Sequence, residues 1–354
     1  MKLIYKNSSF FFPLSLLLMY SIGIIGATGA VGTEMLRVLE VRDFPISELR
    51  LFASANSAGK SLTFRGKQYE IAELDDGSFD SLDIAIFSAG GDISRAWRKQ
   101  CVESGAIMID NSSAFRMESG VPLVIPEINA DDLREHHGVI AVPNCSTIIM
   151  LMAVSPLRKF GRIKRIVVST YQAVSGAGAK AMLELEQQTI NHLKSEPIQP
   201  NIFPHPIAFN LFSHNAPVNE HGYNGEEWKM IMETKKILHD DEIAVTATCI
   251  RVPVFRAHSE SINIEFENKR PSVEEIREAL ANFPGVKVVD DRAGNHFPMP
   301  NEAAGQFDVF AGHIRHDASN PKAVDLFVSG DQLLKGAALN AVQIAESLIE
   351  QKII

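Results

Sequence analysis

Apolar residues follow two different patterns along this chain. In the first 144 residues they form short runs typical of buried strands, and segments with the three- and four-residue spacing of helices separate several of these runs. The runs, each followed by small or polar residues, lie at 22–26, 49–53, 84–87, 107–109 and 139–142. Alternating strands and helices are typical of a parallel sheet covered by helices. We therefore expect an α/β domain over residues 21–144.

After residue 144 the strands no longer alternate regularly with helices. Strands are predicted at 163–172, 243–254, 260–267 and 308–315, and helices at 179–194, 226–239 and 272–282. This order predicts an α+β domain with a mostly antiparallel sheet over residues 145–330. Residues 195–225, rich in Pro, His and Asn, are expected to be irregular. The final segment, 331–354, carries an amphipathic helix that is expected to pack back on the first domain.

A glycine-rich turn joins the first strand to the first helix and comprises Gly26, Ala27, Thr28, Gly29, Ala30, Val31 and Gly32. In dinucleotide-binding folds such glycines allow a tight turn, and the helix N-terminus faces the pyrophosphate. A purely structural turn is the alternative, because this glycine spacing alone is a weak signal. The position between a strand and a helix favours a Rossmann-type nucleotide-binding domain.

The second strand ends in small hydroxyl and amide residues, among them Ser54, Asn56 and Ser57, with Lys60 nearby. An NAD enzyme usually has an acidic residue here for the ribose 2′-hydroxyl, and none is present. NADP therefore fits better, although the same residues would also suit a solvated loop. Ligands in open α/β sheets collect where strands end. The third strand end adds the cofactor candidates Ser88, Ala89 and Gly90.

Cys145 lies between the end of a strand and the start of a helix. Pro143 and Asn144 end the strand, and Ser146 or Thr147 is the expected N-cap of the apolar helix that follows. A helix N-terminus favours a thiolate, so a lowered thiol pKa is expected. The alternative is a buried core cysteine, because free cysteines are among the most buried residues.

Composition narrows the classes of function. The chain is 45% hydrophobic and 22% charged, and its net charge of −9 argues against a general nucleic-acid or anionic-membrane binder. Its three cysteines lack C-x-x-C spacing, and its 11 histidines are scattered. No disulfide framework and no metal site are therefore expected.

Residues 1–20 differ from the rest of the chain. Lys2 and Lys6 precede an apolar run that resembles the core of a signal peptide, but no small-x-small cleavage site follows before the first strand. The run is short for a membrane span and is interrupted by Pro13. Translation from Met19, which would make the leader an artefact or a dispensable arm, is favoured, and a cytoplasmic enzyme is expected.

With these segments assembled, the chain resembles the aspartate-semialdehyde dehydrogenase family from Tyr20 onward. Six motifs carry the resemblance in the family's order and spacing: residues 26–32, 111–116, 143–147, 171–178, 251–259 and 335–346. The resemblance implies NADPH-dependent conversion of L-aspartyl 4-phosphate to L-aspartate 4-semialdehyde and phosphate, a step toward lysine (through diaminopimelate), threonine and methionine. It also implies a homodimer or homotetramer, with residues 145–330 as the catalytic and dimerisation domain.

The resemblance also implies roles for single residues. Cys145 would form a covalent thioacyl intermediate, and His258 would act as general acid and base with a pKa near neutrality. Gln172 would position the intermediate, and Arg251 would bind the substrate α-carboxylate. The remaining implied contacts are Arg116 and Lys229 to phosphate, Glu226 to the substrate ammonium, and Ser175, Gly176 and Gln332 to the cofactor.

Several points stay open. Asn56 stands where many relatives carry an arginine, and Gln332 where they carry Asn, which leaves the cofactor contacts uncertain. Arg251 and His258 lie seven residues apart, so a regular strand would place them on opposite faces. Two alternatives remain. One is N-acetyl-γ-glutamyl-phosphate reductase, whose substrate has no free ammonium for Glu226 to bind. The other is a catalytically silent NADP-binding protein.

Overall fold

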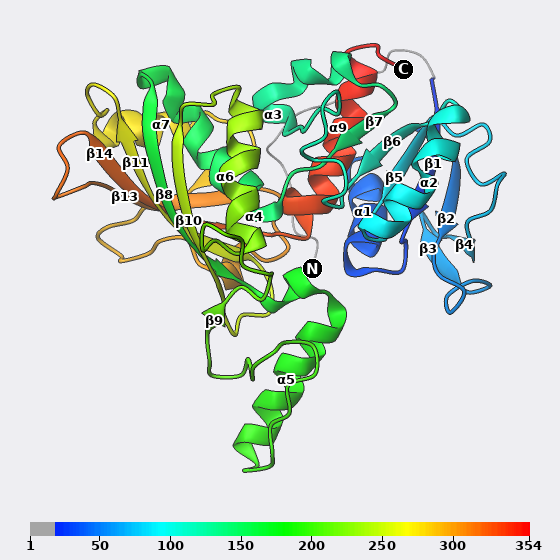
Figure 1. Cartoon of the computed structure of the whole chain (residues 1–354), viewed down its shortest axis with the longest axis horizontal. Coiled ribbons are helices and arrows are strands. Elements are labelled where there is room, and N and C mark those ends of the chain that lie inside the picture. Colours follow the sequence, from blue (N-terminus) through cyan, green and yellow to red (C-terminus); the bar gives the residue numbers. More distant parts are fainter. Residues whose placement is uncertain (1–17) are drawn as a thin grey trace.

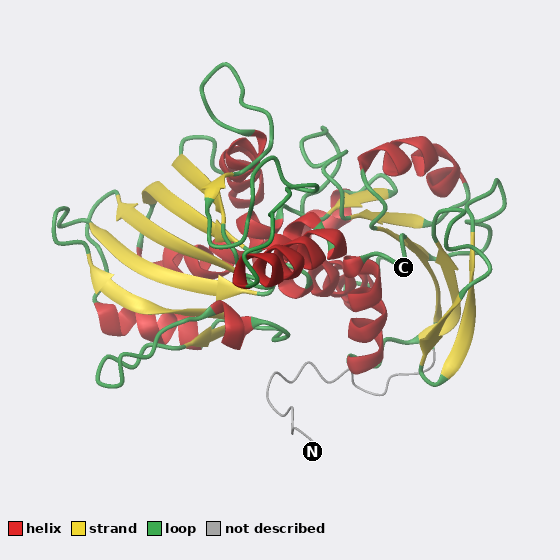
Figure 2. Cartoon of the chain, turned by 90° about the horizontal axis from the view of Figure 1, so that it is seen from below, coloured by secondary structure: helices red, strands yellow, loops and turns green. Residues whose placement is uncertain are grey.

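The structure is a computed structural model that describes residues 18–354, and it contains two seven-stranded sheets with helices between them (Figures 1 and 2). Most of the expected leader, residues 1–17, lies outside the described part. The first sheet has the strand order β3-β4-β2-β1-β5-β6-β7. Its strands are β1 (Tyr20–Ile25), β2 (Ile46–Phe52), β3 (Ser61–Phe64), β4 (Lys67–Ala72), β5 (Ile84–Phe87), β6 (Ile107–Asp110) and β7 (Val139–Ala141).

The first sheet is parallel apart from the β3–β4 hairpin, which confirms the expected Rossmann-like domain. Strands β1, β5 and β6 are buried along their whole length, as their apolar sequences require. The hairpin was missed because its residues are mostly polar and exposed. Helices α1 (Ala30–Val41) and α2 (Gly91–Glu103) follow β1 and β5, so their N-termini lie at the carboxyl edge of the sheet.

The second sheet has the order β12-β13-β14-β11-β8-β10-β9 and is mostly antiparallel, as expected. Pairs β8–β10 and β12–β13 are parallel. The strands are β8 (Ile163–Gln172), β9 (Phe212–Ser213), β10 (Ala244–Arg251), β11 (His258–Phe266), β12 (Val286–Val288), β13 (Val309–His316) and β14 (Ala323–Gly330). Strand β14 was not predicted, although it lies beside β11 in the middle of the sheet.

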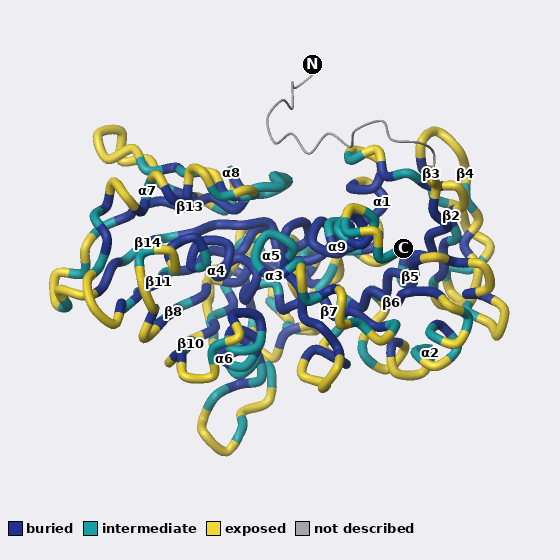
Figure 3. The backbone as a smooth tube through the Cα atoms, turned by 90° about the horizontal axis from the view of Figure 1, so that it is seen from above, coloured by how far each residue is buried: buried dark blue, intermediate teal, exposed yellow. Residues whose placement is uncertain are grey.

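The remaining helices join or extend the two sheets. They are α3 (Pro126–Asn129), α4 (Cys145–Val154), α5 (Ala179–Leu193), α6 (Gly225–Leu238), α7 (Val273–Ala281), α8 (Pro300–Ala303) and α9 (Leu339–Glu350). Helices α4 and α9 are buried in the centre of the molecule (Figure 3). At the C-terminal end of α1, Arg42 donates two hydrogen bonds of 2.6 and 2.7 Å to Glu346 on α9. The expected bounds of the domains, at residues 144 and 330, stay a prediction.

Helix α5 extends away from the rest of the molecule as an arm (Figure 1). The returning chain, residues 194–211, is mostly irregular, as expected. A small apolar cluster holds the arm together and consists of Val174, Ala181, Leu185, Phe203, Ile207 and Ala208. Over residues 18–354, no helix combines the length and the apolar character that a bilayer crossing needs.

Candidate active site

Helix α4 begins at Cys145, directly after the last strand of the first sheet. Its N-cap is Asn144, whose Oδ1 accepts hydrogen bonds from the backbone N–H groups of Ser146 (3.0 Å) and Thr147 (3.2 Å). The expectation of Ser146 or Thr147 as N-cap was wrong, because both residues already lie inside the helix and are buried. Cys145 is therefore the first helical residue, where unpaired N–H groups concentrate.

Asn144 also joins helix α4 to two buried carboxylates of α6. Its Nδ2 donates to Oε1 of Glu226 (2.7 Å), and its backbone N–H donates to Oε2 of Glu233 (2.6 Å). Glu226 accepts two further hydrogen bonds, from Gln172 Nε2 and Lys229 Nζ, both at 3.1 Å. Burial opposes ionisation of Glu226, yet Lys229 and these hydrogen bonds lower the pKa of the carboxyl well below its usual value. Glu226 is an ionised centre around which these side chains gather.

Three expected catalytic or substrate-binding residues share one row of the second sheet. Gln172 on β8 pairs with Arg251 on β10, and the β8–β11 register places His258 next to Gln172 on the other side. A methyl group at Gly176 would lie 3.2 Å from Arg251 Nη1 and equally close to His258 Nε2. Arg251 and His258 therefore converge, because residues 252–257 between them leave the regular strand geometry.

His258 is completely buried and uncharged near neutral pH. Burial and the neighbouring Arg251 lower the pKa of the imidazole to about 3, so the expected value near neutrality was wrong. Nδ1 accepts a hydrogen bond from the Ala173 backbone N–H (3.0 Å). The neutral ring must therefore carry its proton on Nε2, which has no hydrogen-bond partner among the described residues.

Arg251 is held by two contacts, through Nη1 and Nη2, and its Nε is left unpaired within the described part of the chain. Nη1 donates to the Ala173 carbonyl (2.6 Å), and Nη2 lies 2.9 Å from Nε2 of His214. Burial lowers the pKa of His214 to about 4, so this neutral ring accepts from the guanidinium. The buried Nε of Arg251 has no partner in residues 18–354. Sequence reasoning missed His214, which lies in the irregular segment and approaches Arg251 only through the fold.

Cys145 is partly accessible, but its thiol is not acidic in the free protein. Burial raises the pKa of the thiol to about 12, and Glu226 adds to the effect. The charges of Arg116, Arg251 and Lys229 oppose the rise without cancelling it. The expected low thiol pKa was therefore wrong, because removal of water and a nearby carboxylate outweigh the helix N-terminus and the cations.

Arg116 is buried, and all three of its nitrogens donate hydrogen bonds within the protein. Its Nη1 donates to Glu233 Oε1 (3.1 Å), its Nε to the Val142 carbonyl (2.9 Å) and its Nη2 to the Asn111 carbonyl (3.3 Å). Glu233 was missed, although it lies seven residues after Glu226 and hence on the same face of α6. The guanidinium thus ties the end of the first sheet to α6.

The glycine turn shows why two of its glycines are required. Gly26 has φ +88°, and a Cβ there would lie 2.4 Å from the Ser88 carbonyl oxygen; a Cβ at Gly32 would lie 2.2 Å from the Gly26 carbonyl oxygen. Close backbone approach at the N-terminus of α1 is the geometry that a pyrophosphate requires. Of the other turn residues, Ala27 is buried, Thr28 and Gly29 are exposed, and Ala30 and Val31 are half-buried.

The other expected cofactor residues surround this edge of the first sheet or the start of α4. Ser57 Oγ lies 3.5 Å from Thr28 Oγ1, and Lys60 Nζ donates to the carbonyl of Asn56 (2.8 Å). Ser54, Asn56, Ala89 and Gly90 are exposed, whereas Ser57 and Ser88 are half-buried.

Gln332 links two segments of the site. Its Nε2 donates to Ser175 Oγ, and its Oε1 accepts from the Ala257 backbone N–H (2.9 Å). A methyl group at Gly336 would lie 2.9 Å from Cys145 Cβ and 3.3 Å from Gln332 Cβ. Gln332 is therefore near Cys145 and the loop before His258, although its role toward a cofactor stays a prediction.

Two parts of the chain match models of known protein families. A model of the semialdehyde dehydrogenase NAD-binding domain matches residues 21–136, and one of the semialdehyde dehydrogenase dimerisation domain matches residues 154–335. The aspartate-semialdehyde dehydrogenase of Synechocystis sp. is 52% identical over 93% of this chain and 97% of its own length. The chain belongs to the aspartate-semialdehyde dehydrogenase family. It is thus an oxidoreductase with a nicotinamide-cofactor domain, as the resemblance implied.

Solved structures of the aspartate-semialdehyde dehydrogenase family agree with this assignment. The enzyme II of Vibrio cholerae complexed with ASA has a TM-score of 0.92 at 40% identity and covers 94% of this chain and 99% of its own. The Candida albicans enzyme with NADP has a TM-score of 0.73 at 25% identity and covers 95% and 100% of the two chains.

We expect alkylation of Cys145 by iodoacetamide in the free protein to accelerate with pH up to at least pH 10. Because only the thiolate reacts and burial raises the thiol pKa to about 12, the rate should not level off in this range. Mass spectrometry of the Cys145 peptide gives the rate, and N-acetylcysteine serves as the exposed control. A plateau below pH 7 would contradict the raised pKa and restore the thiolate predicted from sequence.

Proposed function

We propose that this protein is an NADP-dependent aspartate-semialdehyde dehydrogenase that reduces L-aspartyl 4-phosphate to L-aspartate 4-semialdehyde through a thioester on Cys145. One observation carries the proposal: a cysteine at a helix N-terminus is joined, through Asn144 and Glu226, to the sheet row that holds Gln172, Arg251 and His258. The name and close similarity of the relatives support the substrate. On the same basis we place the reaction in lysine, threonine and methionine synthesis.

The proposed chemistry has two halves. The Cys145 thiolate attacks the acyl carbon of the acyl phosphate, and the C–O bond to phosphate breaks to leave a thioester and free phosphate. A hydride from the bound nicotinamide then reduces the thioester carbon. The resulting oxyanion collapses to the aldehyde and releases the thiolate. The backbone N–H of Cys145, which Asn144 Oδ1 does not cap, is suited to stabilise the negative charge that appears on the substrate oxygen in both halves.

The structure modifies the role that the resemblance implied for His258. As a neutral ring with its proton on Nε2, His258 can donate a hydrogen bond to the substrate oxyanion without losing its proton. To accept the proton of the Cys145 thiol, the ring must first turn Nδ1 away from the Ala173 N–H. We propose that His258 stabilises the oxyanion in its resting orientation and exchanges protons with Cys145 after that turn.

The side chains proposed to bind the charged groups of the substrate keep unused hydrogen-bond donors or acceptors. We propose that the Nε of Arg251, unpaired over residues 18–354, and the second N–H of its Nη2 bind the α-carboxylate as a bidentate partner. Glu226 accepts three hydrogen bonds, and a carboxylate offers about four lone-pair sites, so one site remains for the substrate ammonium. We propose that Lys229, which is half-buried, and Arg116 bind the phosphate. Gln172 would hold the thioester in place beside Glu226.

For the cofactor we propose NADP, held by the turn at residues 26–32 and by Ser175, Gly176 and Gln332. Ser54, Asn56, Ser57 and the strand end at Ser88, Ala89 and Gly90 would complete the site. Thr28 and Ser57 lie together, and Lys60 is close by, so hydroxyl donors and a positive charge are available for a 2′-phosphate. The Candida albicans relative solved with NADP supports this choice.

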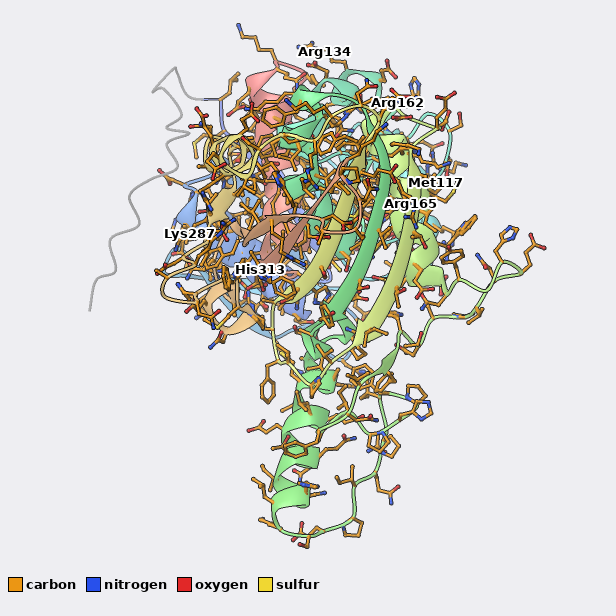
Figure 4. All side chains as sticks on the ribbon, turned by 90° about the vertical axis from the view of Figure 1, so that its left-hand side faces the viewer. Met117, Arg134, Arg162, Arg165, Lys287 and His313 are labelled. Atoms are coloured by element: carbon orange, nitrogen blue, oxygen red, sulfur yellow. The ribbon has the colours of Figure 1, made fainter. Side chains whose placement is uncertain are left out.

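We propose that two copies associate through the second sheet. Figure 4 shows the outer face of this sheet with no helix in front of its strands, and the α5 arm extends beyond it. Tyr171 on this face is 39% exposed, and Leu183 and Leu193 on the arm are 62% and 76% exposed. These exposed apolar side chains suit an interface between two copies.

Sedimentation equilibrium should give twice the 39.0 kDa chain mass, and a 39.0 kDa species at micromolar concentration would contradict the dimer.

A cytoplasmic location is part of the proposal, because all three cysteines are free and a catalytic thiol stays reduced there.

The direct test is phosphate-dependent reduction of NADP, and of NAD for comparison, by aspartate semialdehyde. We expect turnover with the wild-type protein and a loss of at least about 10⁴-fold in Cys145→Ala, because no other group supplies the nucleophile. NADPH fluorescence should show that the variant still binds the cofactor. Cys101→Ala is the matched control and should stay active, since Cys101 is buried in α2 of the first domain. Full activity of Cys145→Ala, or none in the wild type, would refute the proposal.

Arg251→Lys tests recognition of the carboxylate. An ammonium cannot form the bidentate pair, and a hydrogen bond to a charged group is worth about 1.5–3 kcal/mol, so the KM for aspartate semialdehyde should rise about 10- to 100-fold. The exposed Arg162, paired with Glu242, provides the control Arg162→Lys, which should leave KM unchanged. If Arg251→Lys lowers kcat alone, its carboxylate role is wrong.

A further inference from the structure

Arg256 connects the cofactor-binding helix α1 to the loop that leads into His258. Its Nη1 lies 2.7 Å from Glu34 Oε1, and its Nε donates to Asp331 Oδ2 at 2.6 Å. Glu34 is on α1, directly after the glycine turn, and Asp331 follows β14. The Arg256 guanidinium therefore bridges helix α1 of the first domain and the end of strand β14 in the second sheet.

Both carboxylates are held firmly by further contacts. Asp331 is completely buried, and its two oxygens also accept from the backbone N–H groups of Gly305 (2.6 Å) and Leu333 (3.0 Å). Glu34 accepts a second hydrogen bond, of 2.7 Å, from Arg37. Burial opposes ionisation of Glu34, but hydrogen bonds from Arg37 and Arg256 lower the pKa of the carboxyl below its usual value. The planar fork of an arginine can satisfy both carboxylates at once, which an ammonium cannot do.

The residue between Arg256 and His258 has an unfavourable backbone conformation. Ala257 has φ +72°, in the left-handed region that side chains other than glycine rarely adopt, and it is buried. Such strain persists only where the surroundings enforce it. Here Arg256 fixes one side of Ala257, Gln332 accepts its N–H at 2.9 Å, and the Ala173 N–H fixes the following ring.

We propose that Arg256 is a positioning residue: by bridging Glu34 and Asp331 it enforces the strained turn at Ala257 and so aligns His258 with the cofactor-bearing helix. The inference rests on the proposed function, because it assigns His258 to the reaction and the cofactor to the turn before α1. Arg256 contacts neither the glycine turn nor Cys145 directly, so its effect should fall on turnover and not on binding.

The test is Arg256→Met, which keeps an unbranched side chain and removes the guanidinium. Active sites are counted by alkylation of Cys145, and kcat and KM are measured for NADP reduction by aspartate semialdehyde with phosphate. Displacement of a catalytic group by about 1 Å can cost about 10²-fold, so we expect kcat per site to fall about 10- to 100-fold, with KM for NADP within about threefold of wild type. A kcat within about threefold of wild type, or a change in KM alone, would overturn the inference.

Two further variants separate positioning from general destabilisation. Arg37→Met removes the other partner of Glu34 but leaves Asp331 and Ala257 untouched, so its kcat should match wild type. Adding Ala257→Gly to Arg256→Met should recover part of the lost kcat, because glycine adopts φ +72° without penalty. No recovery would contradict the role of the strained turn. If Arg256→Met does not fold, Arg256→Lys replaces it, because an ammonium reaches only one carboxylate and kcat must still fall.

These outcomes are distinct from failure of the proposed function. If wild type shows no phosphate-dependent turnover, the proposed function is wrong. If wild type turns over and Arg256→Met does so equally well, only the role of Arg256 is wrong.

Discussion

The structure depends on the hydrogen bonds of Asn144, the residue between the last strand of the first sheet and the helix that begins with Cys145. One side chain caps the helix and binds Glu226, while the backbone N–H of the same residue binds Glu233. Each buried polar group of Asn144 is thereby paired, which is the condition under which a buried polar network makes a site rigid. The position of Cys145 relative to the second sheet follows from these few bonds.

Both buried carboxylates near Cys145 are paired with cations before any substrate arrives. Glu226 pairs with Lys229, and Glu233 pairs with Arg116. His258 is neutral, and burial also raises the pKa of Glu260, two residues further along β11, well above its usual value. Charged groups that lack water must be paired in this way, because an isolated buried charge is strongly unfavourable. In the described part of the chain Arg251 donates hydrogen bonds only to a carbonyl and a neutral histidine, so its positive charge can offset the net negative charge of a substrate with two anionic groups and one cationic group.

Sequence reasoning named residues that the fold brings together, but it did not predict their ionisation states. The glycine turn, Cys145 and the motif around His258 could be recognised because each combines a residue type with a local position. The pKa values of Cys145 and His258 could not, because burial depends on which distant segments cover them. The N-cap was misassigned for a related reason: Asn144 was interpreted only as the end of a strand, whereas its side chain turns back onto the helix.

Missed residues and elements show the same limit. Glu233 and His214 contact Arg116 and Arg251, more than 30 residues away in sequence; the spacing of Glu233 from Glu226 hinted at a shared helix face, but no local pattern reveals the arginine partners. Strand β14 (Ala323–Gly330) lies in the middle of the second sheet, and its mostly apolar sequence was a signal that the prediction overlooked. In contrast, the fully apolar strands of the first sheet were predictable because burial on both faces requires apolar residues throughout.

In the proposed reaction, Cys145 carries the acyl group between the two halves. The most direct measurement mixes a stoichiometric amount of the protein with aspartate semialdehyde and NADP in the absence of phosphate, followed by rapid acid quench and peptide mass spectrometry. We expect a single burst of one NADPH per active site, together with an aspartyl thioester on the peptide that contains Cys145. A burst with the acyl group on Cys101 or Cys249, or no acyl-enzyme at all, would contradict this expectation.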